Sequence, residues 1–477
     1  MIQRLLNIAL LLLCCQYLSS QEVSISPELN LRNYFSYHLL GDVDGKSIVF
    51  RDRGYVKEVD VFNKDLELVQ SAELFLEKRR VDIFNVMELD TSFQLLYGYF
   101  ENDSMVFNYR MYNNRVELVD SFSFLRLDKS NIRKKIGTSV SDDKNRILFT
   151  TIDDEENMVF LLFNNTTKYL EWSSKIKVDG NVRNSLYSIV LANNGDFIVS
   201  LSANEWSDRP KASSFLVVSP RLASHQYVSF ANLDYKLDNL TVRCDNKNFK
   251  WLICGTYSSN KESEAKGYFY TLKQTEDFQI TESFNLLAFD PKLYQELLQG
   301  KKRKSRVFED ITIKDVLFRN DGGFAIISEI QREYARRNPY NGYSRSSYDN
   351  YTSRRAWIDY YNEDIIISNV SPDGSMMWNR VLYKKQFSQD DDGIYSSFFV
   401  MKSPSRLRFI YNDEIKRNNT VSEYLMDPAG KVARNSLLST AYHKMKLRFK
   451  DAIQISPNTL IVPSERSYDL NLVRITY

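Results

Sequence analysis

Tyrosine and arginine crowd one segment of this 477-residue chain, and their side chains suit binding better than bond breaking. Residues 331–362 hold seven Tyr, six Arg and Trp357, and a basic run lies shortly before them within 286–306. Tyr and Arg offer large contact areas, stacking and bidentate hydrogen bonds, and both are enriched where proteins bind partners. The candidate binding residues are Tyr334, Arg336, Arg337, Tyr340, Tyr343, Arg345, Tyr348, Arg354, Arg355 and Trp357, with Lys301, Lys302, Arg303 and Lys304 from the basic run.

This Tyr/Arg segment has two interpretations. With the basic run nearby, it predicts an acidic partner, such as an anionic polysaccharide, a lipid headgroup or an acidic protein surface. The alternative is a long hairpin that extends two strands and packs on its own domain. Long loops inside compact domains are usually functional or disordered, so we favour the binding interpretation.

Catalytic constellations are sparse. The three histidines, His38, His225 and His443, fall in three different repeat units, which argues against a histidine metal site or a histidine-assisted nucleophile. The chain has no G-x-S-x-G, phosphate-binding Gly-rich loop or H-E-x-x-H motif. We therefore expect no catalytic residue, metal or cofactor. A glycosidase needs only two facing carboxylates, so with 61 acidic residues a carbohydrate-active or other hydrolase is the alternative.

Two smaller groups could carry chemistry. Asp390, Asp391 and Asp392 could cap arginines of the Tyr/Arg segment or bind a hard cation, but calcium prefers ligands at alternating positions. We favour a solvated or salt-bridged loop. Cys244 and Cys254 flank one predicted hairpin turn, so an exported chain would pair them in a disulfide. The alternative is two buried thiols.

A recurring turn shows which elements position these residues. Short polar clusters, each followed at once by an apolar strand, end at Gly45, Ser92, Asn145, Gly195, Asn248, Gly322, Ser405 and Asn458. Their successive spacings are 47, 53, 50, 53, 74, 83 and 53 residues. A period near 50 residues is typical of a propeller. The strands that follow carry apolar residues at both parities, as expected for strands covered on two faces.

A second set of turns divides each repeat into four strands, a to d. These turns lie at 62–65, 112–115, 163–167, 219–221, 274–277, 371–374 and 427–430. The pattern predicts an all-β propeller of eight four-stranded blades, with seven blades as the alternative. Because the chain ends on the third strand of the last unit, residues 22–26 or 29–33 are expected to close the ring, which removes exposed edges.

The topology of a four-stranded blade places both long insertions on one face. The a–b and c–d turns share one face, and the b–c and d–a connections share the other. Residues 286–306 form a d–a connection with a helix signal, from N-cap Asp290 and Pro291 to Gly300. Residues 331–362 form a b–c connection in the next unit. We therefore expect the two insertions side by side.

The first twenty residues have the features of a secretory signal peptide. Arg4 is basic, residues 8–15 are apolar, and Ser19 and Ser20 are small, which predicts cleavage after Ser20. Lipidation at Cys14 or Cys15 is an alternative. We expect residues 21–477 to form one exported domain, periplasmic, cell-surface or secreted, with no membrane span. The net charge of +2 gives no field that would attract nucleic acid, and the oligomeric state is not determined.

The chain resembles uncharacterised exported bacterial β-propeller proteins. The resemblance lies in the signal peptide, the 50-residue period, the DG-type turns and the Tyr-rich insertion before DIIISNVSPDGSMMW. It implies a propeller outside the cytoplasm and no activity. The turn at 371–378 is also similar to that of quinoprotein-type propellers, where the Trp is structural, so an oxidoreductase is a distant third hypothesis. The first hypothesis is a non-enzymatic binding or scaffold propeller that binds a protein or an anionic glycan.

Overall fold

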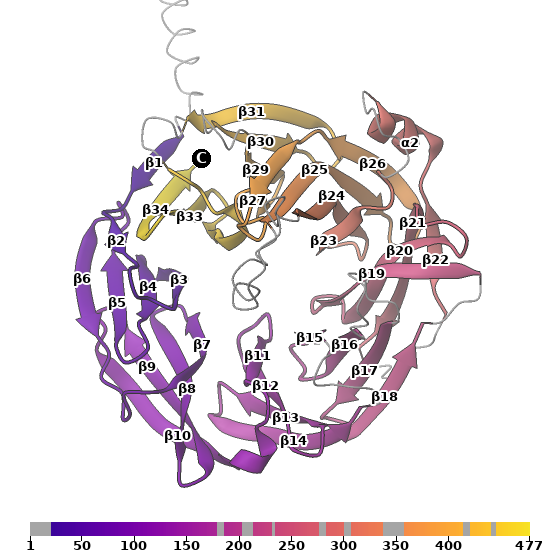
Figure 1. Ribbon diagram of the computed structural model, residues 1–477. Helices are drawn as coiled ribbons and strands as arrows, with labels where there is room; N and C mark the ends of the chain where they lie inside the picture. The colour runs from indigo at the N-terminus through magenta and orange to yellow at the C-terminus, as the bar shows by residue number, and fades with distance from the viewer. Residues whose placement is uncertain are drawn as a thin grey trace, which may run out of the picture.

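The computed structural model describes residues 21–178, 186–202, 213–230, 234–275, 283–299, 307–336, 357–413, 420–439 and 445–477. Their strands form eight antiparallel sheets arranged in a ring around a central axis (Figure 1). The fold is therefore an eight-bladed β-propeller, as the turn spacing predicts, and the seven-blade alternative is wrong. The predicted signal peptide, residues 1–20, lies outside the described residues. No helix among the described residues has the length and apolar character needed to cross a membrane.

Each blade runs from an inner strand a to an outer strand d. Blades one to three comprise β3 (Ser36–Val43), β4 (Lys46–Asp52), β5 (Lys57–Phe62) and β6 (Leu68–Glu73); β7 (Asp82–Glu88), β8 (Ser92–Glu101), β9 (Ser104–Asn113) and β10 (Leu118–Asp128); and β11 (Gly137–Val140), β12 (Arg146–Ile152), β13 (Asn157–Asn164) and β14 (Tyr169–Lys177). Blades four and five comprise β15 (Leu186–Leu191), β16 (Phe197–Ser202), β17 (Ser213–Ser219) and β18 (Ser224–Ser229); and β19 (Tyr235–Asp245), β20 (Lys250–Ser259), β21 (Ala265–Gln274) and β22 (Asn285–Ala288).

The remaining blades include two additions to the four-strand pattern. Blade six comprises β23 (Ile311–Phe318), β24 (Phe324–Arg336), β25 (Trp357–Val370), β26 (Met376–Leu382) and the additional β27 (Gln386–Gln389). Blade seven comprises β28 (Phe398–Lys402), β29 (Leu407–Asn412), β30 (Thr420–Met426) and β31 (Val432–Ser439). Blade eight comprises β32 (Ile453–Ser456), β33 (Thr459–Arg466) and β34 (Asp469–Thr476), with β1 (Glu22–Ile25) and β2 (Leu29–Asn30) from the start of the described chain.

The core lies between the blades rather than inside any one sheet. In β4, Ile48 and Phe50 pack with blade two, whereas Val49 packs with blade eight. Successive side chains of a strand point to opposite faces, so a strand sandwiched between two blades needs apolar residues at both parities. Each pair of neighbouring blades shares a buried apolar cluster of this kind. Burying one such side chain contributes roughly 1.5–3 kcal/mol to folding.

The ring is closed by the start of the described chain, as predicted. β1 pairs with β34 from Glu22 opposite Thr476 to Ile25 opposite Val473, and β2 pairs further along the same strand. Between them, Ser26 Oγ accepts a hydrogen bond of 2.8 Å from the Leu472 backbone N–H. Both segments proposed for closure therefore contribute. This pairing leaves no open edge on β34.

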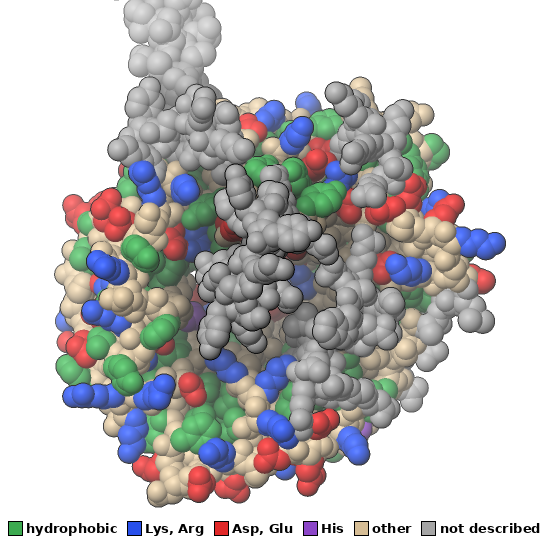
Figure 2. Space-filling model, in the orientation of Figure 1, with side chains coloured by type: hydrophobic (Ala, Val, Ile, Leu, Met, Phe, Trp, Pro, Cys, Tyr) green, Lys and Arg blue, Asp and Glu red, His purple; other side chains and the backbone are tan. Residues whose placement is uncertain are grey.

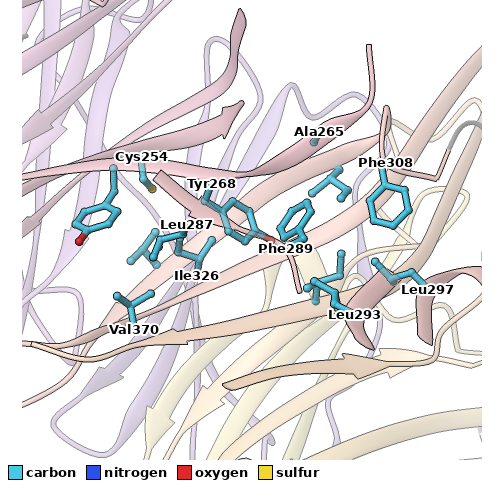
Figure 3. Close-up of a cluster of buried hydrophobic side chains, with 14 of the residues drawn as sticks. Cys254, Ala265, Tyr268, Leu287, Phe289, Leu293, Leu297, Phe308, Ile326 and Val370 are labelled. Carbon is cyan, nitrogen blue, oxygen red and sulfur yellow. The ribbon is translucent and has the colours of Figure 1, made fainter. Parts of the chain in front are cut away.

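The insertion at 286–306 begins with the predicted helix. In α2 (Pro291–Leu298) the Asp290 side chain accepts a hydrogen bond of 2.6 Å from the Leu293 N–H, which caps the first turn. Leu293 and Leu297 are buried against Phe289 and Phe308 in the cluster shared by blades five and six (Figure 3). The helix is thus fixed at the outer rim of the ring beside β26 (Figure 1). The predicted stop, Gly300, lies outside the described residues.

The predicted disulfide is wrong. Cys244 and Cys254 lie on the paired strands β19 and β20, but both are free thiols. Cys244 lies opposite Trp251 and Cys254 lies opposite Thr241, so the two cysteines are offset by three positions along the ladder. Because an odd offset points side chains to opposite faces, Cys254 packs towards blade six and Cys244 towards blade four. The alternative interpretation, two unpaired thiols, describes the structure, with Cys254 buried and Cys244 half-buried.

Candidate functional site

The Tyr/Arg segment begins as an extension of blade six. β24 and β25 stay paired beyond the end of the blade, up to Arg336 opposite Trp357. β27 pairs with the outer half of β25, from Asn362 opposite Gln386 to Asp359 opposite Gln389. We name this three-stranded sheet, formed by 331–336, 357–362 and 386–389, the blade-six extension. The paired strands agree with the hairpin interpretation for the part of the Tyr/Arg segment nearest blade six. Their ends, Arg336 and Trp357, flank residues 337–356 in the sequence.

One side of the blade-six extension is aromatic. The Tyr334 and Tyr361 rings meet edge-on with centroids 5.8 Å apart, and Tyr361 and Phe387 are 4.9 Å apart. Tyr334 is 43% exposed, so its ring is available to a partner. Such aromatic pairs add about 0.5–1.5 kcal/mol beyond their buried area. The neighbouring rings of Tyr361 and Phe387 therefore hold the exposed Tyr334 in a fixed position near the end of the described strands.

The other side is held by the Asp triplet. Asp390 Oδ1 accepts a hydrogen bond of 2.8 Å from the Ile358 N–H, and Asp392 Oδ1 accepts one of 3.0 Å from the Tyr360 hydroxyl. Asp391 Oδ1 accepts one of 2.8 Å from Ser388 Oγ. Asp390 and Asp392 are exposed, so the loop is solvated as expected, and each carboxylate in addition fastens a different part of the extension. Burial, reinforced by the bond to Asp392, raises the pKa of Tyr360 to about 12, so this hydroxyl remains a donor at neutral pH.

A buried ion pair lies beneath the extension. Lys384 Nζ lies 2.5 Å from Glu329 Oε1, and the two side chains are 0% and 1% exposed. Lys314 Nζ reaches the other oxygen of Glu329 at 3.3 Å, and Lys384 also donates to the Ser396 carbonyl at 3.0 Å. Burial lowers the pKa of Lys384, and the adjacent Glu329 opposes that shift. Because both charges are withdrawn from solvent, the pair fastens β24 to the connection between β26 and β27 and is not a ligand site.

The return of the 286–306 insertion is bonded to the same base. The Gln331 N–H donates to the Asp310 carbonyl at 2.9 Å, and Arg332 Nε lies 2.5 Å from Asp310 Oδ2. The described residues that follow the basic run therefore join blade six at the base of the Tyr/Arg segment, whereas the basic run itself and residues 337–356, whose proximity the sequence predicts, lie outside the described residues.

The structure describes little of the predicted binding set itself. Tyr334 is described with its side chain, and Arg336 and Trp357 are described as strand positions. The following predicted residues lie outside the described residues: Arg337, Tyr340, Tyr343, Arg345, Tyr348, Arg354, Arg355, Lys301, Lys302, Arg303 and Lys304. Sequence reasoning missed β27 and the Glu329–Lys384 pair. A signal for the pair was present, since Glu329 is a lone acid in the apolar run GFAIISEI.

The histidines do not converge in the described residues. His38 lies on the inner strand of blade one and His225 on the outer strand of blade four, while His443 lies outside the described residues. Within the described residues no cluster of His, Cys, Asp and Glu could hold a metal ion. Glu88 near the centre of the ring is 3.0 Å from Lys144, and Asp315 is 3.2 Å from Arg243.

The charge of the molecular surface is mixed. Figure 2 shows Lys and Arg side chains interspersed with Asp and Glu around the rim of the face that it draws. This agrees with the net charge of +2. Any attraction for a charged partner must therefore come from local segments rather than from the protein as a whole.

Comparison with known proteins adds a fold likeness and no family. No protein-family model and no curated protein matches this chain. A polysaccharide lyase structure is 9% identical with a TM-score of 0.39, covering 84% of this chain and 94% of that one. The propeller domain of the Trilobed protease from Pyrococcus furiosus is 9% identical with a TM-score of 0.36, covering 84% and 96%. Dipeptidyl peptidase 4 from Porphyromonas gingivalis is 12% identical with a TM-score of 0.44, covering 90% and 56%.

All three TM-scores lie below 0.5, so these likenesses carry no argument about activity. The fold assignment rests on the strand pairing of this chain.

Proposed function

We propose that this chain is an exported, non-enzymatic binding or scaffold propeller that holds an anionic partner on the Tyr/Arg segment and the basic run. The partner is an acidic protein surface or an anionic glycan. Export is the part of the proposal that rests on the predicted signal peptide at residues 1–20.

The bracing of the blade-six extension is the observation that carries the proposal. An ordinary b–c connection would need no additional strand, no carboxylate triplet bonded to it and no buried ion pair below it. Here all three stabilise the two strands from which residues 337–356 depart. A rigid base lowers the conformational entropy lost on binding, which raises affinity without new contacts.

Local charge supports an anionic partner. Residues 337–356 contain four arginines and one aspartate, and residues 301–306 contain five basic residues and no acid. Within about 10 Å at moderate ionic strength, such segments attract acidic groups and lose that attraction as salt rises. Arginine also binds carboxylate and sulfate groups through two parallel hydrogen bonds.

The test removes the segment and keeps its base. Arg336 and Trp357 lie opposite each other on the ladder, so replacing residues 337–356 with Asn-Gly closes a two-residue hairpin. Residues 21–477 with and without this replacement are used to capture partners from a cell-envelope extract. We expect the shortened protein to fold, as judged by circular dichroism and thermal unfolding, and to lose the partner.

A matched control separates this site from general charge. Arg79 and Arg80 are exposed on the d–a connection between β6 and β7, on the same face but in another blade. The double variant Arg79→Ser and Arg80→Ser should retain the partner. The proposal would be overturned if the shortened protein captures the partner as well as the unchanged protein does. It would also be overturned if the control variant loses the partner to the same extent as the shortened protein.

A further inference from the structure

A cleft of about 700 Å³ lies where blades eight, one and two meet. It is lined by the segment between β2 and β3, by β3 itself, by residues around Arg448 before β32, and by the β33–β34 turn. These are d–a and b–c connections, so the cleft opens on the same face as the blade-six extension. We name it the closure cleft, because the chain ends that close the ring form its walls. Its volume is typical of a small-molecule site.

Aromatic side chains are held in place at the closure cleft. Phe35 is 81% exposed and Tyr468 is 61% exposed. The Phe35 ring lies so close to Gly54 that an added Cβ would come within 2.7 Å of it. The Leu31 N–H donates to the Tyr468 carbonyl at 2.6 Å, which joins the two segments that carry these rings. Large exposed rings with a fixed backbone are suited to stacking against a ligand.

The wall beneath them is polar and rich in acceptors. Arg448 Nε lies 2.6 Å from Asp451 Oδ2, and its Nη1 bonds Glu465 Oε2. In the described residues the remaining oxygen of each carboxylate accepts no hydrogen bond from protein. The Arg448 guanidinium lies 5.7 Å from the Tyr37 ring centre. The Tyr37 hydroxyl is shielded and has no hydrogen-bond partner among the described residues. Buried hydroxyls are normally paired, so this one marks a place for a polar ligand group or a water.

The charges of the cleft disfavour an anionic ligand. Arg448 is shared by two carboxylates, and Glu88 on the opposite wall is paired with Lys144 at 3.0 Å. Burial lowers the pKa of His38, so its ring is neutral at pH 7. The lining therefore offers no unpaired cation to an anion. Arg448 balances only one of these two carboxylates, so the wall keeps an excess negative charge and spare capacity to accept hydrogen bonds from the hydroxyl groups of a neutral ligand.

We propose that the closure cleft binds an uncharged saccharide. A sugar ring stacks its C–H face on Phe35 or Tyr468, because the face of an aromatic ring is electron-rich. The sugar hydroxyls donate to the unused oxygens of Asp451 and Glu465. This site is separate from the Tyr/Arg segment and its partner, so each can fail without the other.

Calorimetric titration of residues 21–477 tests the proposal. The probes are uncharged gluco-, manno- and xylo-oligosaccharides, a uronic acid oligosaccharide of equal length, and choline as a cation that aromatic rings bind. We expect heat from at least one uncharged probe and weaker binding of the other two classes. Phe35→Ala and Tyr468→Ala should each weaken binding about tenfold, which corresponds to about 1.4 kcal/mol.

The matched control is Tyr169→Ala, because Tyr169 is 74% exposed on the outer strand of blade three, away from the cleft. It should bind the saccharide like the unchanged protein, as should the variant with residues 337–356 replaced. Both aromatic targets are exposed, so unchanged thermal unfolding will show that the variants fold. The proposal would be overturned if no uncharged probe binds, or if the uronate or choline binds more tightly than the uncharged probes. It would also be overturned if Tyr169→Ala weakens saccharide binding as much as Phe35→Ala and Tyr468→Ala do.

Discussion

The blade-six extension and the closure cleft lie on the same face and are built in opposite ways. The extension is one long insertion, fastened to its own blade by β27, the Asp triplet and a buried ion pair. The closure cleft comes from short, ordinary connections that meet only because β1 and β2 complete blade eight. Local reinforcement therefore maintains the first region, whereas ring closure maintains the second. We expect changes in one to leave the other unaltered except through Tyr395, whose hydroxyl donates to the Glu465 carbonyl at 3.0 Å.

The largest expected effect follows from removing the buried cation under the extension. Lys384→Met leaves Glu329 buried with one partly exposed partner, so we expect the free energy of unfolding to fall by about 3–5 kcal/mol. Urea unfolding measures this. Lys144→Met is the matched control at the closure cleft, where the pair with Glu88 is 38% and 34% exposed, and should cost at most about 1 kcal/mol.

A second substitution distinguishes charge burial from packing. Adding Glu329→Leu to Lys384→Met removes the unpaired charge and should restore most of the lost stability. Equal stability of Lys384→Met and the unchanged protein would mean that the pair does not stabilise the extension.

Asp391→Ala should loosen the extension without unfolding the ring. It removes the acceptor of the Ser388 Oγ and Gly393 N–H bonds, which we expect to cost about 1–3 kcal/mol. Hydrogen exchange of residues 386–389 should accelerate while that of β3 stays constant. Asp427→Ala, which removes a similar turn bond to the Lys431 N–H in blade seven, should leave both unchanged. Equal acceleration in β3 would show that the two regions are coupled.

Gly54→Ala should lower the affinity of the closure cleft for saccharide and leave the blade-six extension unaltered. Gly54 has a φ of +83°, where an L-residue costs about 1–2 kcal/mol, and its new Cβ would displace Phe35. Gly45→Ala is a matched control, because its φ is +79° and its nearest neighbour is the flexible end of Lys64. Both variants should lose similar stability, but only Gly54→Ala should lose saccharide affinity. Equal affinities would argue against Phe35 as a stacking platform.

The smallest effect is expected at Tyr37. Its hydroxyl has no partner among the described residues, so Tyr37→Phe should change the free energy of unfolding by less than about 0.5 kcal/mol or raise it slightly. Tyr268→Phe provides the contrast, since that hydroxyl bonds Ser328 Oγ at 2.6 Å and its loss should cost about 1 kcal/mol or more. Thermal and urea unfolding compare them. A large loss in Tyr37→Phe would reveal a structural partner.

The sequence was sufficient for features that are encoded locally. Turn spacing predicted eight blades, the apolar residues at both parities of 47–50 predicted packing on two sides, and Asp290 with Pro291 predicted the start of α2. Each signal lies within a few residues and reflects backbone or burial requirements.

Features that depend on register or on distant segments could not be predicted. The cysteine pairing failed because a three-position offset between β19 and β20 decides which face each thiol occupies. β27 was missed because Gln386–Gln389 is short and polar. Tyr37 and Arg448 come from opposite ends of the chain and meet only in the closed ring, so no local pattern marks the closure cleft.

The most direct test of the central claim is the salt concentration at which the protein elutes from an immobilised polyanion. Residues 21–477 are compared with the variant in which Asn-Gly replaces residues 337–356 and with the Arg79→Ser, Arg80→Ser variant. The account predicts that the shortened protein elutes at clearly lower salt, although it loses only four basic residues, and that the control elutes almost with the unchanged protein. Elution of the shortened protein together with the unchanged protein would contradict a partner-binding role for the Tyr/Arg segment.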